Sequence, residues 1–271
     1  MSLASEFIGG GKALALAAKG QACPICLGSG VSTIGVMGMQ QIGAGRWACV
    51  CEAGRQALAA HQASRGAAEI GAMLAGAQIP AKFAGYDFES FRARTVKSVE
   101  KVKGLRMARE WTQTLTLPSP AKAGEGEKSG EGVRPWLFLY GKTGRGKTGL
   151  GVAALKALIA AGHAGRFVAS FDMFEEMKQR FGGDVEAYTQ ALADVELLML
   201  DEIVPTQITD WRRGVLFELL WRRDADRKLT IMTTAAGTDV LTQAVTEAGW
   251  RRIRENSVMV ELGGNEINYG M

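Results

Sequence analysis

The sequence predicts an α/β protein in which a parallel sheet is flanked by helices and preceded by a small N-terminal domain. From residue 136 onward, short continuous apolar runs alternate with helical stretches, and such runs are typical of parallel strands that are buried on both faces. A glycine-rich turn follows the first run and leads directly into a helix. Four cysteines within 29 residues near the N-terminus indicate a separate small domain there.

The composition is that of an ordinary globular protein. Hydrophobic residues make up 47% and charged residues 22% of the 271 residues, which excludes wholesale disorder. No apolar run approaches the roughly 20 residues that cross a bilayer, and the apolar stretch at 13–18 is too short for the core of a signal peptide. We therefore expect a soluble, cytoplasmic protein with no membrane partner.

Positive charge is concentrated in the first part of the chain. Residues 1–117 hold 13 Lys and Arg against 7 Asp and Glu, a net charge of +6, whereas residues 118–271 hold 19 against 21, a net charge of −2. A basic segment of this kind is compatible with an acidic partner, such as a nucleic acid or an acidic protein surface. An ordinary solvated surface explains the asymmetry equally well.

Two helical stretches precede the alternating region. An Ala-rich segment with good helix propensity predicts a helix over about 53–75, although three glycines weaken it. A second amphipathic stretch predicts a helix over about 96–115. Residues 118–135 are polar, low in complexity and bounded by prolines, which predicts a flexible loop or linker.

The alternating region predicts a definite order of elements. Its apolar runs have strand length, and the stretches between them have the length and composition of helices. The predicted strands are Trp136–Tyr140, Arg166–Ala169, Leu197–Leu200, Leu229–Thr233 and Val258–Leu262, and the predicted helices are Lys147–Ala161, Met173–Phe181 and Trp211–Arg222.

The turn after the first strand matches a phosphate-binding loop. Its sequence fits the pattern G-x-x-x-x-G-K-[ST] at every defined position, with a strand before it and a helix after it. Glycines let backbone N–H groups turn toward phosphate oxygens, Lys147 would reach the β- and γ-phosphates, and Thr148 would bind Mg²⁺. The candidate nucleotide-binding residues are Gly141, Lys142, Thr143, Gly144, Arg145, Gly146, Lys147, Thr148, Gly149 and Asp201.

A pair of acidic residues ends the strand at 197–200. Asp201 lies 54 residues after Lys147, and Glu202 follows it. Alone, such a pair is usually a strand end that meets solvent. Together with a phosphate loop it predicts a site that hydrolyses nucleotides, with Asp201 as a second Mg²⁺ ligand and Glu202 as the catalytic base, next to Lys147.

The four cysteines have the spacing of a zinc site. Cys23 and Cys26 form a C-x₂-C pair, and 22 residues later Cys49 and Cys51 form a C-x-C pair. Two close pairs can bring four thiolates to one Zn²⁺, and a site with four protein ligands is structural rather than catalytic. The alternatives are two disulfides, which an intracellular protein disfavours, or four buried free thiols.

The segment from Ile79 onward resembles the AAA+ ATPases of the bacterial helicase-loader group, DnaC and DnaI, and the transposase helper IstB. The resemblance covers about 190 residues. It implies an N-terminal zinc-binding, partner-docking domain at 1–78 and an AAA+ domain at 79–271, with 118–135 as a surface insertion. The residues that carry it are Ile79–Phe83 with Phe88–Phe91, the phosphate loop, Asp201–Ile203 and Pro205–Thr234.

The same resemblance implies several features of the site. Residues 79–91 would pack near the adenine of ATP. In a homo-oligomer, an arginine of one subunit would complete the site of its neighbour. Arg252 is the favoured candidate among three arginines at 251–254. Thr233 and Thr234 stand where the family commonly has a sensor Thr/Ser-Asn, and the family's C-terminal Ser-Tyr-Arg is missing, so we expect slow hydrolysis and little or no C-terminal lid.

The resemblance also implies a function. We expect an ATP-dependent loader of a hexameric replicative helicase onto single-stranded DNA, in the cytoplasm of a bacterial cell or a phage-infected host. The alternatives are a transposase-helper ATPase of IstB type and a weakly hydrolysing, ATP-bound adaptor. A basic helix end next to an aromatic residue suits single-stranded DNA but equally suits a solvated surface; these residues are Lys178, Arg180 and Phe181.

Overall fold

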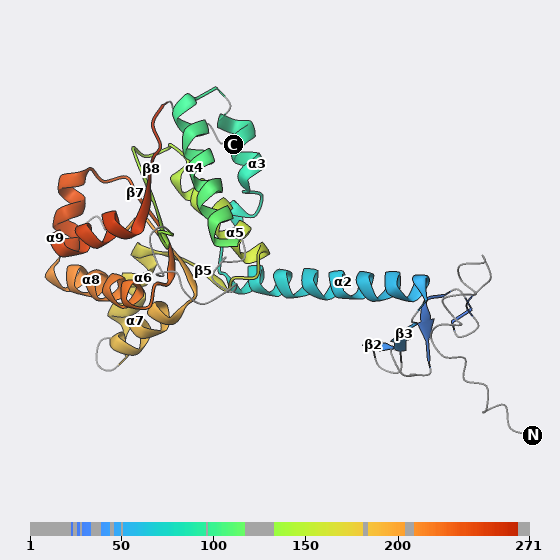
Figure 1. Cartoon of the computed structure of the whole chain (residues 1–271). Coiled ribbons are helices and arrows are strands. Elements are labelled where there is room, and N and C mark those ends of the chain that lie inside the picture. Colours follow the sequence, from blue (N-terminus) through green and yellow to red (C-terminus); the bar gives the residue numbers. More distant parts are fainter. Residues whose placement is uncertain are drawn as a thin grey trace, which may run out of the picture. The chain divides into compact units, whose positions relative to one another are not determined.

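The computed structural model divides the chain into two compact units, Met1–Gly71 and Ala72–Met271 (Figure 1). Each is described by itself. The described residues are 23, 26–27, 29–33, 39–43, 46–49, 51–95, 97–116, 133–180, 184–203 and 209–264. Most of the predicted loop at 118–135, the candidate DNA contact Phe181 and the last residues of the chain lie outside them.

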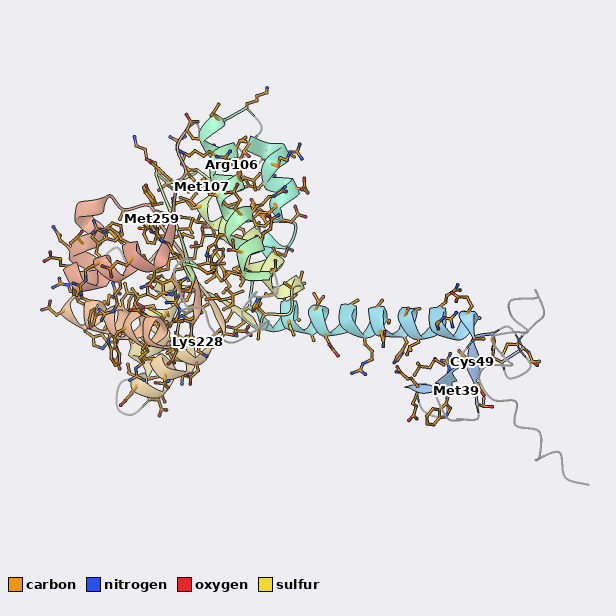
Figure 2. All side chains as sticks on the ribbon, viewed as in Figure 1. Met39, Cys49, Arg106, Met107, Lys228 and Met259 are labelled. Atoms are coloured by element: carbon orange, nitrogen blue, oxygen red, sulfur yellow. The ribbon has the colours of Figure 1, made fainter. Side chains whose placement is uncertain are left out.

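The first unit contains a small antiparallel sheet in the order β1-β3-β2. Its strands are short, and the buried side chains around them are mainly the four cysteines and Met39, which Figure 2 labels together with Cys49. Gly54 is required at a close approach, because a Cβ atom there would lie 1.8 Å from the carbonyl oxygen of Cys49. The strands are β1 (Val31–Ser32), β2 (Gln40–Gly43) and β3 (Arg46–Ala48).

A long helix, α2 (Glu52–Gly76), follows this sheet. It confirms the helix predicted over 53–75, and its bounds differ from the prediction by one residue at each end. Most of its residues are exposed, so its high alanine content stabilises it locally where packing does not. Arg55 and Glu52 form an ion pair in its first turn, where a negative charge is favourable.

The second unit is built on a parallel sheet with the strand order β5-β6-β7-β4-β8. Every described pairing in it is parallel, and the ends of β4, β7 and β8 align at Tyr140, Thr234 and Glu261. The α/β prediction is therefore confirmed. The strands are β4 (Trp136–Tyr140), β5 (Gly165–Ala169), β6 (Leu197–Asp201), β7 (Leu229–Thr234) and β8 (Ser257–Glu261).

Helices cover both faces of this sheet. Figure 1 shows α3, α4 and α5 on one side and α8 and α9 on the other. The helices predicted at 96–115, 147–161, 173–181 and 211–222 are present with shifted ends. The helical elements are η1 (Ala81–Phe83), α3 (Phe88–Thr95), α4 (Val99–Thr116), α5 (Lys147–Ala160), α6 (Ser170–Gln179), α7 (Val185–Asp194), α8 (Asp210–Ala225) and α9 (Thr238–Asn256).

The sequence did not predict α3, α7 or α9. The first two span only 8 and 10 residues, which is too short for a clear apolar period. α9 contains a kink at Thr246, whose φ of 63° and ψ of 161° are not helical. This kink interrupts the period that would otherwise have indicated one helix.

The strands alternate their side chains between two cores, as the pleat requires. Trp136 and Phe138 of β4 point to one face and are buried with side chains of α6 to α9. Leu137 and Leu139 point to the other face and are buried against α4 and α5. Continuous apolar runs in the sequence therefore reflect burial on both faces.

One cation lies in the first of these cores. Arg223 of α8 is fully buried, and burial lowers its pKa to about 9, which leaves it charged at neutral pH. Its guanidinium donates hydrogen bonds to the carbonyl oxygens of Leu192, Ala193 and Val195, at 2.7 to 3.0 Å. It also donates to Leu229 O and to Thr230 Oγ1, and so ties the end of α7 to β7.

Among the described residues, no helix combines the length and the apolar character that a membrane span would need.

Candidate functional site

The predicted phosphate loop joins β4 to α5 and has the backbone geometry that its glycines allow. Gly144 and Gly146 have φ values of 77° and 89°, in the left-handed region that favours glycine. Gly146 also caps the N-terminus of α5, where free N–H groups attract anions. At Gly141, with φ 135°, a Cβ atom would lie 2.5 Å from the carbonyl oxygen of Leu262. The loop therefore tolerates no side chain there.

Lys147 begins α5 and is buried, with 6% of its surface exposed. Its Nζ donates a hydrogen bond to the carbonyl oxygen of Lys142 at 3.1 Å. Burial lowers its pKa, and the nearby carboxylates of Glu202 and Asp201 oppose that shift. The loop thus holds a desolvated cation at the start of the helix, where an added phosphate would be strongly favoured.

Asp201, at the end of β6, accepts two hydrogen bonds on one oxygen. Thr148 Oγ1 donates to Asp201 Oδ1 at 2.8 Å, and Thr233 Oγ1 donates to the same atom at 2.7 Å. Hydroxyl and carboxylate oxygens are the hard ligands that Mg²⁺ prefers. The donor set of Thr148 and Asp201 therefore fits Mg²⁺.

Glu202 lies directly beyond the strand in an unusual backbone conformation. Its φ is 53°, which is uncommon for a residue other than glycine and costs free energy that the surrounding contacts must offset. Its N–H donates to Thr233 Oγ1 at 2.9 Å. Its Oε1 accepts hydrogen bonds from the N–H of Ala235 at 2.8 Å and from Thr234 Oγ1 at 3.4 Å. The end of β7 thus holds both the backbone and the carboxylate of Glu202.

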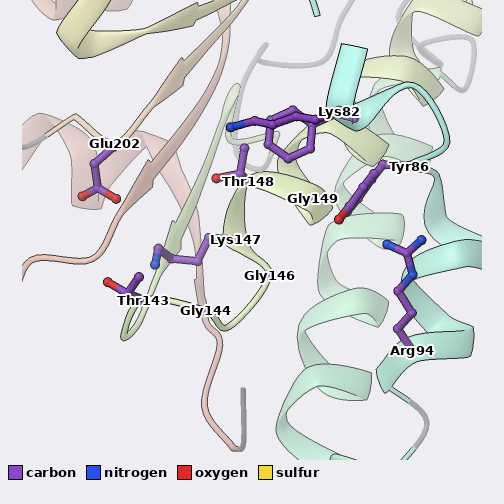
Figure 3. Close-up of a pocket in the computed structure, with 11 residues that line it drawn as sticks. Lys82, Tyr86, Arg94, Thr143, Gly144, Gly146, Lys147, Thr148, Gly149 and Glu202 are labelled. Atoms are coloured by element: carbon purple, nitrogen blue, oxygen red, sulfur yellow. The ribbon is translucent and has the colours of Figure 1, made fainter. Parts of the chain in front are cut away.

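These residues border a cavity of about 580 Å³ (Figure 3). That volume lies in the range of small-molecule sites. The phosphate loop forms one wall, and η1 and α3 form the other, where Lys82 lies 5.0 Å from the ring of Phe83 and Arg94 lies 4.7 Å from the ring of Tyr86. The lining residues are Lys82, Phe83, Tyr86, Arg94, Thr143, Gly144, Gly146, Lys147, Thr148, Gly149 and Glu202.

The second wall is attached to α5 by Lys156, a residue outside the phosphate-loop motif. Lys156 Nζ donates hydrogen bonds to the carbonyl oxygens of Ala84 and Tyr86. The family resemblance directed attention to residues 79–91, of which Lys82, Phe83 and Tyr86 line the cavity. Arg94 was missed, because its position depends on how α3 packs rather than on any local pattern.

The remaining candidate residues of the motif lie around this cavity. Gly141 and Lys142 line a neighbouring cavity between β4, β8 and α9. Asp201 lies behind Thr148, to which it is hydrogen-bonded. The Nη1 atom of Arg145 is buried and, within the part of the chain that the structure describes, has no hydrogen-bond partner.

Arg252, the candidate for a contribution to a neighbouring subunit, is engaged within its own chain. Its Nε donates to Asp224 Oδ2 at 3.1 Å, and its guanidinium lies 5.3 Å from the ring of Phe217. Arg251 is two-thirds exposed, and Arg254 is also exposed. Arg252 could reach another subunit only by leaving Asp224.

The candidate DNA contacts at the end of α6 are paired with carboxylates of the same helix. Lys178 Nζ lies 2.6 Å from Glu175, and Arg180 Nη2 lies 2.8 Å from Glu176. Exposed ion pairs of this kind are weak and exchange readily. The third candidate, Phe181, lies outside the described residues.

The four cysteines form a second candidate site, in the first unit. All four are buried, and their sulfur atoms lie within 4.8 Å of one another. Cys23 Sγ lies 3.6 Å from Cys49 Sγ, and Cys26 Sγ lies 3.5 Å from Cys51 Sγ. In a tetrahedral site with Zn–S bonds of about 2.3 Å, sulfur atoms are about 3.8 Å apart. The donor set therefore fits Zn²⁺. Burial raises the pKa of Cys49 to about 12, and a bound cation would favour the thiolate form.

Comparison with protein families identifies the nucleotide-binding part of the chain. Residues 134–266 match the family model described as "IstB-like ATP binding protein". The matched range contains the phosphate loop, Asp201 and Glu202, and the sensor threonines of β7. This part of the chain is similar to IstB-like ATP binding proteins, which confirms the resemblance that the sequence motifs predicted.

Helicase loaders are similar to this chain in sequence and in fold. The replicative helicase loader DnaC of Escherichia coli strain K12 is 26% identical over 121 residues, which are 43% of this chain and 49% of DnaC. The chain thus spans about half the length of the curated relatives it matches. A crystal structure of the DnaC helicase loader has a TM-score of 0.55 at 20% identity and covers 68% of this chain and 100% of that one. A crystal structure of DnaI has a TM-score of 0.52 at 20% identity, and the match covers 70% of this chain and 95% of the DnaI chain.

At these identities the two solved structures show the fold alone. They confirm for the second unit the α/β fold of these two structures, a parallel sheet between layers of helices. The chain is similar to replication proteins and carries an ATP-binding domain.

Proposed function

We propose that this chain, with its IstB-like ATP-binding domain at residues 134–266, hydrolyses ATP and thereby times the loading of a hexameric replicative helicase onto single-stranded DNA. The observation that supports hydrolysis is that the hydroxyls of Thr148 and Thr233 both donate to Oδ1 of Asp201, beside Glu202 and the phosphate loop. The likeness to DnaC over 121 residues supports the choice of partner.

The residues of the cavity have distinct roles in this proposal. Backbone N–H groups of Gly144 to Gly146 and the Lys147 ammonium bind the phosphates. Thr148 and Asp201 hold Mg²⁺, which neutralises negative charge on the β- and γ-phosphate oxygens. Glu202 accepts a proton from the attacking water through its carboxylate. Because Oε1 of Glu202 also accepts from the N–H of Ala235, the end of β7 sets its orientation.

The cysteine site belongs to the docking part of the proposal. We assign the four thiolates to one structural Zn²⁺, which closes the fold of a partner-binding domain at residues 1–78. The sheet of this unit is short, with strands of 2 to 4 residues, so a metal would supply stability that its small core does not. The helicase would dock on this domain in the cytoplasm of a bacterial cell or a phage-infected host.

Self-association completes the proposal. A homo-oligomer would place an arginine of one subunit at the nucleotide of the next, where a guanidinium stabilises charge on the transferred phosphoryl group. Arg252 remains the candidate, with its bond to Asp224 as the resting state. Lys178, Arg180 and Phe181 remain the candidate contacts to single-stranded DNA.

A helicase-loading assay tests this function. The purified full chain is mixed with the replicative helicase of the same host and with circular single-stranded DNA, and helicase bound to the DNA is measured with and without ATP. Loading that depends on ATP and is lost in Lys147→Ala supports the proposal. Helicase that neither associates with the chain nor gains DNA-bound molecules contradicts it.

A transposase-helper function is the second candidate, because the matching family model is IstB-like. ATP-dependent filaments on double-stranded DNA, together with binding to a transposase instead of a helicase, would favour it. A third candidate is an adaptor that binds ATP and hydrolyses it slowly, since Ala235 and Thr234 hold the carboxylate of Glu202. Equal loading by wild type and by a variant that cannot hydrolyse ATP would favour the adaptor.

Thr233 provides a test of the arrangement around Asp201. Thr233→Val keeps the shape of the side chain but removes the hydroxyl that donates to Asp201 and accepts from the N–H of Glu202. We expect ATP turnover to fall about tenfold, because both acidic residues lose a positioning contact. Steady-state phosphate release measures the effect. Thr189→Val is the control, because the hydroxyl of this buried threonine donates to the carbonyl oxygen of Val185 in the same helix. Equal turnover in Thr233→Val and wild type would contradict the expectation.

The zinc assignment predicts a measurable metal content. Wild-type protein should hold one zinc ion per chain by atomic absorption, and Cys49→Ser should hold less than a tenth of that, because one of four ligands is lost. A chelator should also unfold the first unit, seen as a change in the fluorescence of Trp47, which packs on the cysteine cluster. Wild-type protein that is purified in the presence of zinc but contains none would contradict the assignment.

A further inference from the structure

A positively charged cavity beside the nucleotide site is lined by residues to which the function proposed above assigns no role. Its volume is about 530 Å³, and it lies between the end of α3 and the first turn of α4. Arg94 lines both this cavity and the nucleotide cavity, so the two adjoin at its side chain. The lining residues are Arg94, Thr95, Lys97, Ser98, Val99, Glu100, Lys101 and Gly264.

The lining carries three cations and one carboxylate. That carboxylate, Glu100, is engaged at the start of α4: it accepts a hydrogen bond from Ser98 Oγ at 3.0 Å. Its own backbone N–H and the Ser98 hydroxyl lower its pKa. Lys101 also lowers the pKa of Glu100, so this carboxylate offsets one of the three cations, and the lining keeps a net positive charge.

One of these cations is buried next to a further positive charge. Lys101 is only 3% exposed. Burial lowers its pKa, and the guanidinium of Arg145 in the phosphate loop lowers it further. The Nη1 atom of Arg145 is buried and lacks a hydrogen-bond partner among the described residues. The carboxylate of Glu100 opposes the lowering of the Lys101 pKa, and a further anion would offset the remaining repulsion between Lys101 and Arg145.

The local sequence reinforces this positive field. Residues 82–110 contain eight Lys and Arg and four Asp and Glu, a net charge of +4, which equals the net charge of the whole chain. Much of the net positive charge of residues 1–117 thus lies in the η1–α3–α4 segment, and three of its eight cations line this cavity. An excess of cations on one face is the electrostatic signature of a site for anions.

We propose that this cavity binds a phosphate group, presented either by the backbone of single-stranded DNA or as a free phosphate ion. Lys97, Lys101 and Arg94 supply the positive charges and hydrogen-bond donors, which suit phosphate oxygens. The site is separate from the phosphate loop and does not require ATP hydrolysis. Because Arg94 contributes to both cavities, an occupant here contacts a residue of the nucleotide site.

Lysine acetylation measured by mass spectrometry tests the site directly. The full chain is first saturated with Mg²⁺ and a non-hydrolysable ATP analogue, so that the phosphate loop does not take the probe. Inorganic phosphate or the oligonucleotide dT20 is then added, with chloride at the same ionic strength as the control. We expect Lys97 to react about fivefold more slowly with the probe, while Lys103 of α4, which is exposed and outside the cavity, keeps its rate.

Variants and salt dependence provide a second readout. Lys97→Ala should weaken dT20 binding about fivefold and reduce the salt slope by about 0.7, the value for one lost contact to a single strand. Lys103→Ala is the matched control and should change neither. Lys101→Met would also remove a charge, but it alters a buried residue. Lys97→Ala is sufficient for this test, because Lys97 is exposed and substitutions at exposed positions change stability little.

The outcomes distinguish the two sources of phosphate. Protection of Lys97 by both probes assigns the site to the DNA backbone, and protection by phosphate alone assigns it to the free ion. Equal reactivity of Lys97 with and without either probe, and equal dT20 binding in Lys97→Ala and Lys103→Ala, would overturn the proposal. A separate titration with a fluorescent nucleotide reports on the phosphate loop, so failure of the proposed ATP site is seen independently.

Discussion

Replacing Glu202 by glutamine is expected to lower the rate of ATP hydrolysis at least about a hundredfold, because general-base catalysis contributes roughly 10²–10⁴-fold. Glutamine has the shape of glutamate, and its carbonyl oxygen can still accept the hydrogen bond from the N–H of Ala235. It cannot accept a proton from water. The backbone of residue 202, with φ 53°, keeps its contact to Thr233. ATP binding should therefore stay within about twofold of wild type.

Phosphate release at saturating ATP measures the turnover, and a fluorescent ATP analogue measures the binding. Glu261→Gln is the matched control: this carboxylate ends the neighbouring strand β8, in register with Tyr140 of β4, but does not line the nucleotide cavity. It should leave turnover unchanged. If Glu202→Gln hydrolysed ATP at the wild-type rate, Glu202 would not be the base. If turnover were also low in both proteins, the adaptor function would gain support.

Replacing Arg223 by methionine is expected to destabilise the second unit by at least about 3 kcal/mol, because each buried acceptor that is left without its donor costs about 1–3 kcal/mol. Methionine fills much of the same volume, but it leaves the carbonyl oxygens of Leu192, Ala193, Val195 and Leu229 without their donor. Buried carbonyl groups without partners are costly. Arg223→Lys should be nearly as unstable, since one ammonium cannot reproduce five hydrogen bonds with planar geometry.

Urea unfolding followed by tryptophan fluorescence measures this loss, because five of the six tryptophans lie in the second unit. The neighbouring Arg222, which pairs with Glu218 and Glu186 at the surface, supplies the control. Arg222→Ala should shift the free energy of unfolding by no more than about 1 kcal/mol. Equal midpoints for Arg223→Met and Arg222→Ala would show that the buried hydrogen bonds contribute little to stability.

Much of the candidate site was predictable from local sequence. The phosphate loop has fixed spacing between a strand and a helix, and its glycines have the left-handed φ values that the pattern requires. Asp201 and Thr148 lie 53 positions apart in sequence but meet at 2.8 Å, because the carboxyl ends of parallel strands share one edge of the sheet. The cysteine spacing likewise predicted four neighbouring thiols, which lie within 4.8 Å of one another.

Other features depended on packing between distant segments. The wall formed by Lys82, Tyr86 and Arg94 exists because Lys156 of α5 holds the segment after η1. No periodicity within residues 79–95 indicates that arrangement. Arg252 similarly looked available in the sequence, whereas the fold places it against Asp224. The basic charge of residues 1–117 was visible in the sequence, but the cavity that three of its cations line was not.

The sequence by itself determined the strands of the second unit, most of its longer helices and the chemistry of the two candidate sites, because strand and helix periods, glycine conformations and ligand spacing are properties of neighbouring residues. Only the tertiary structure decided which elements lie next to one another. The strand order places β7 between β6 and β4, and this alone brings Thr233 to both Asp201 and Glu202. Such contacts join residues about 30 positions apart, and their geometry follows from packing the two cores rather than from any local preference of the chain.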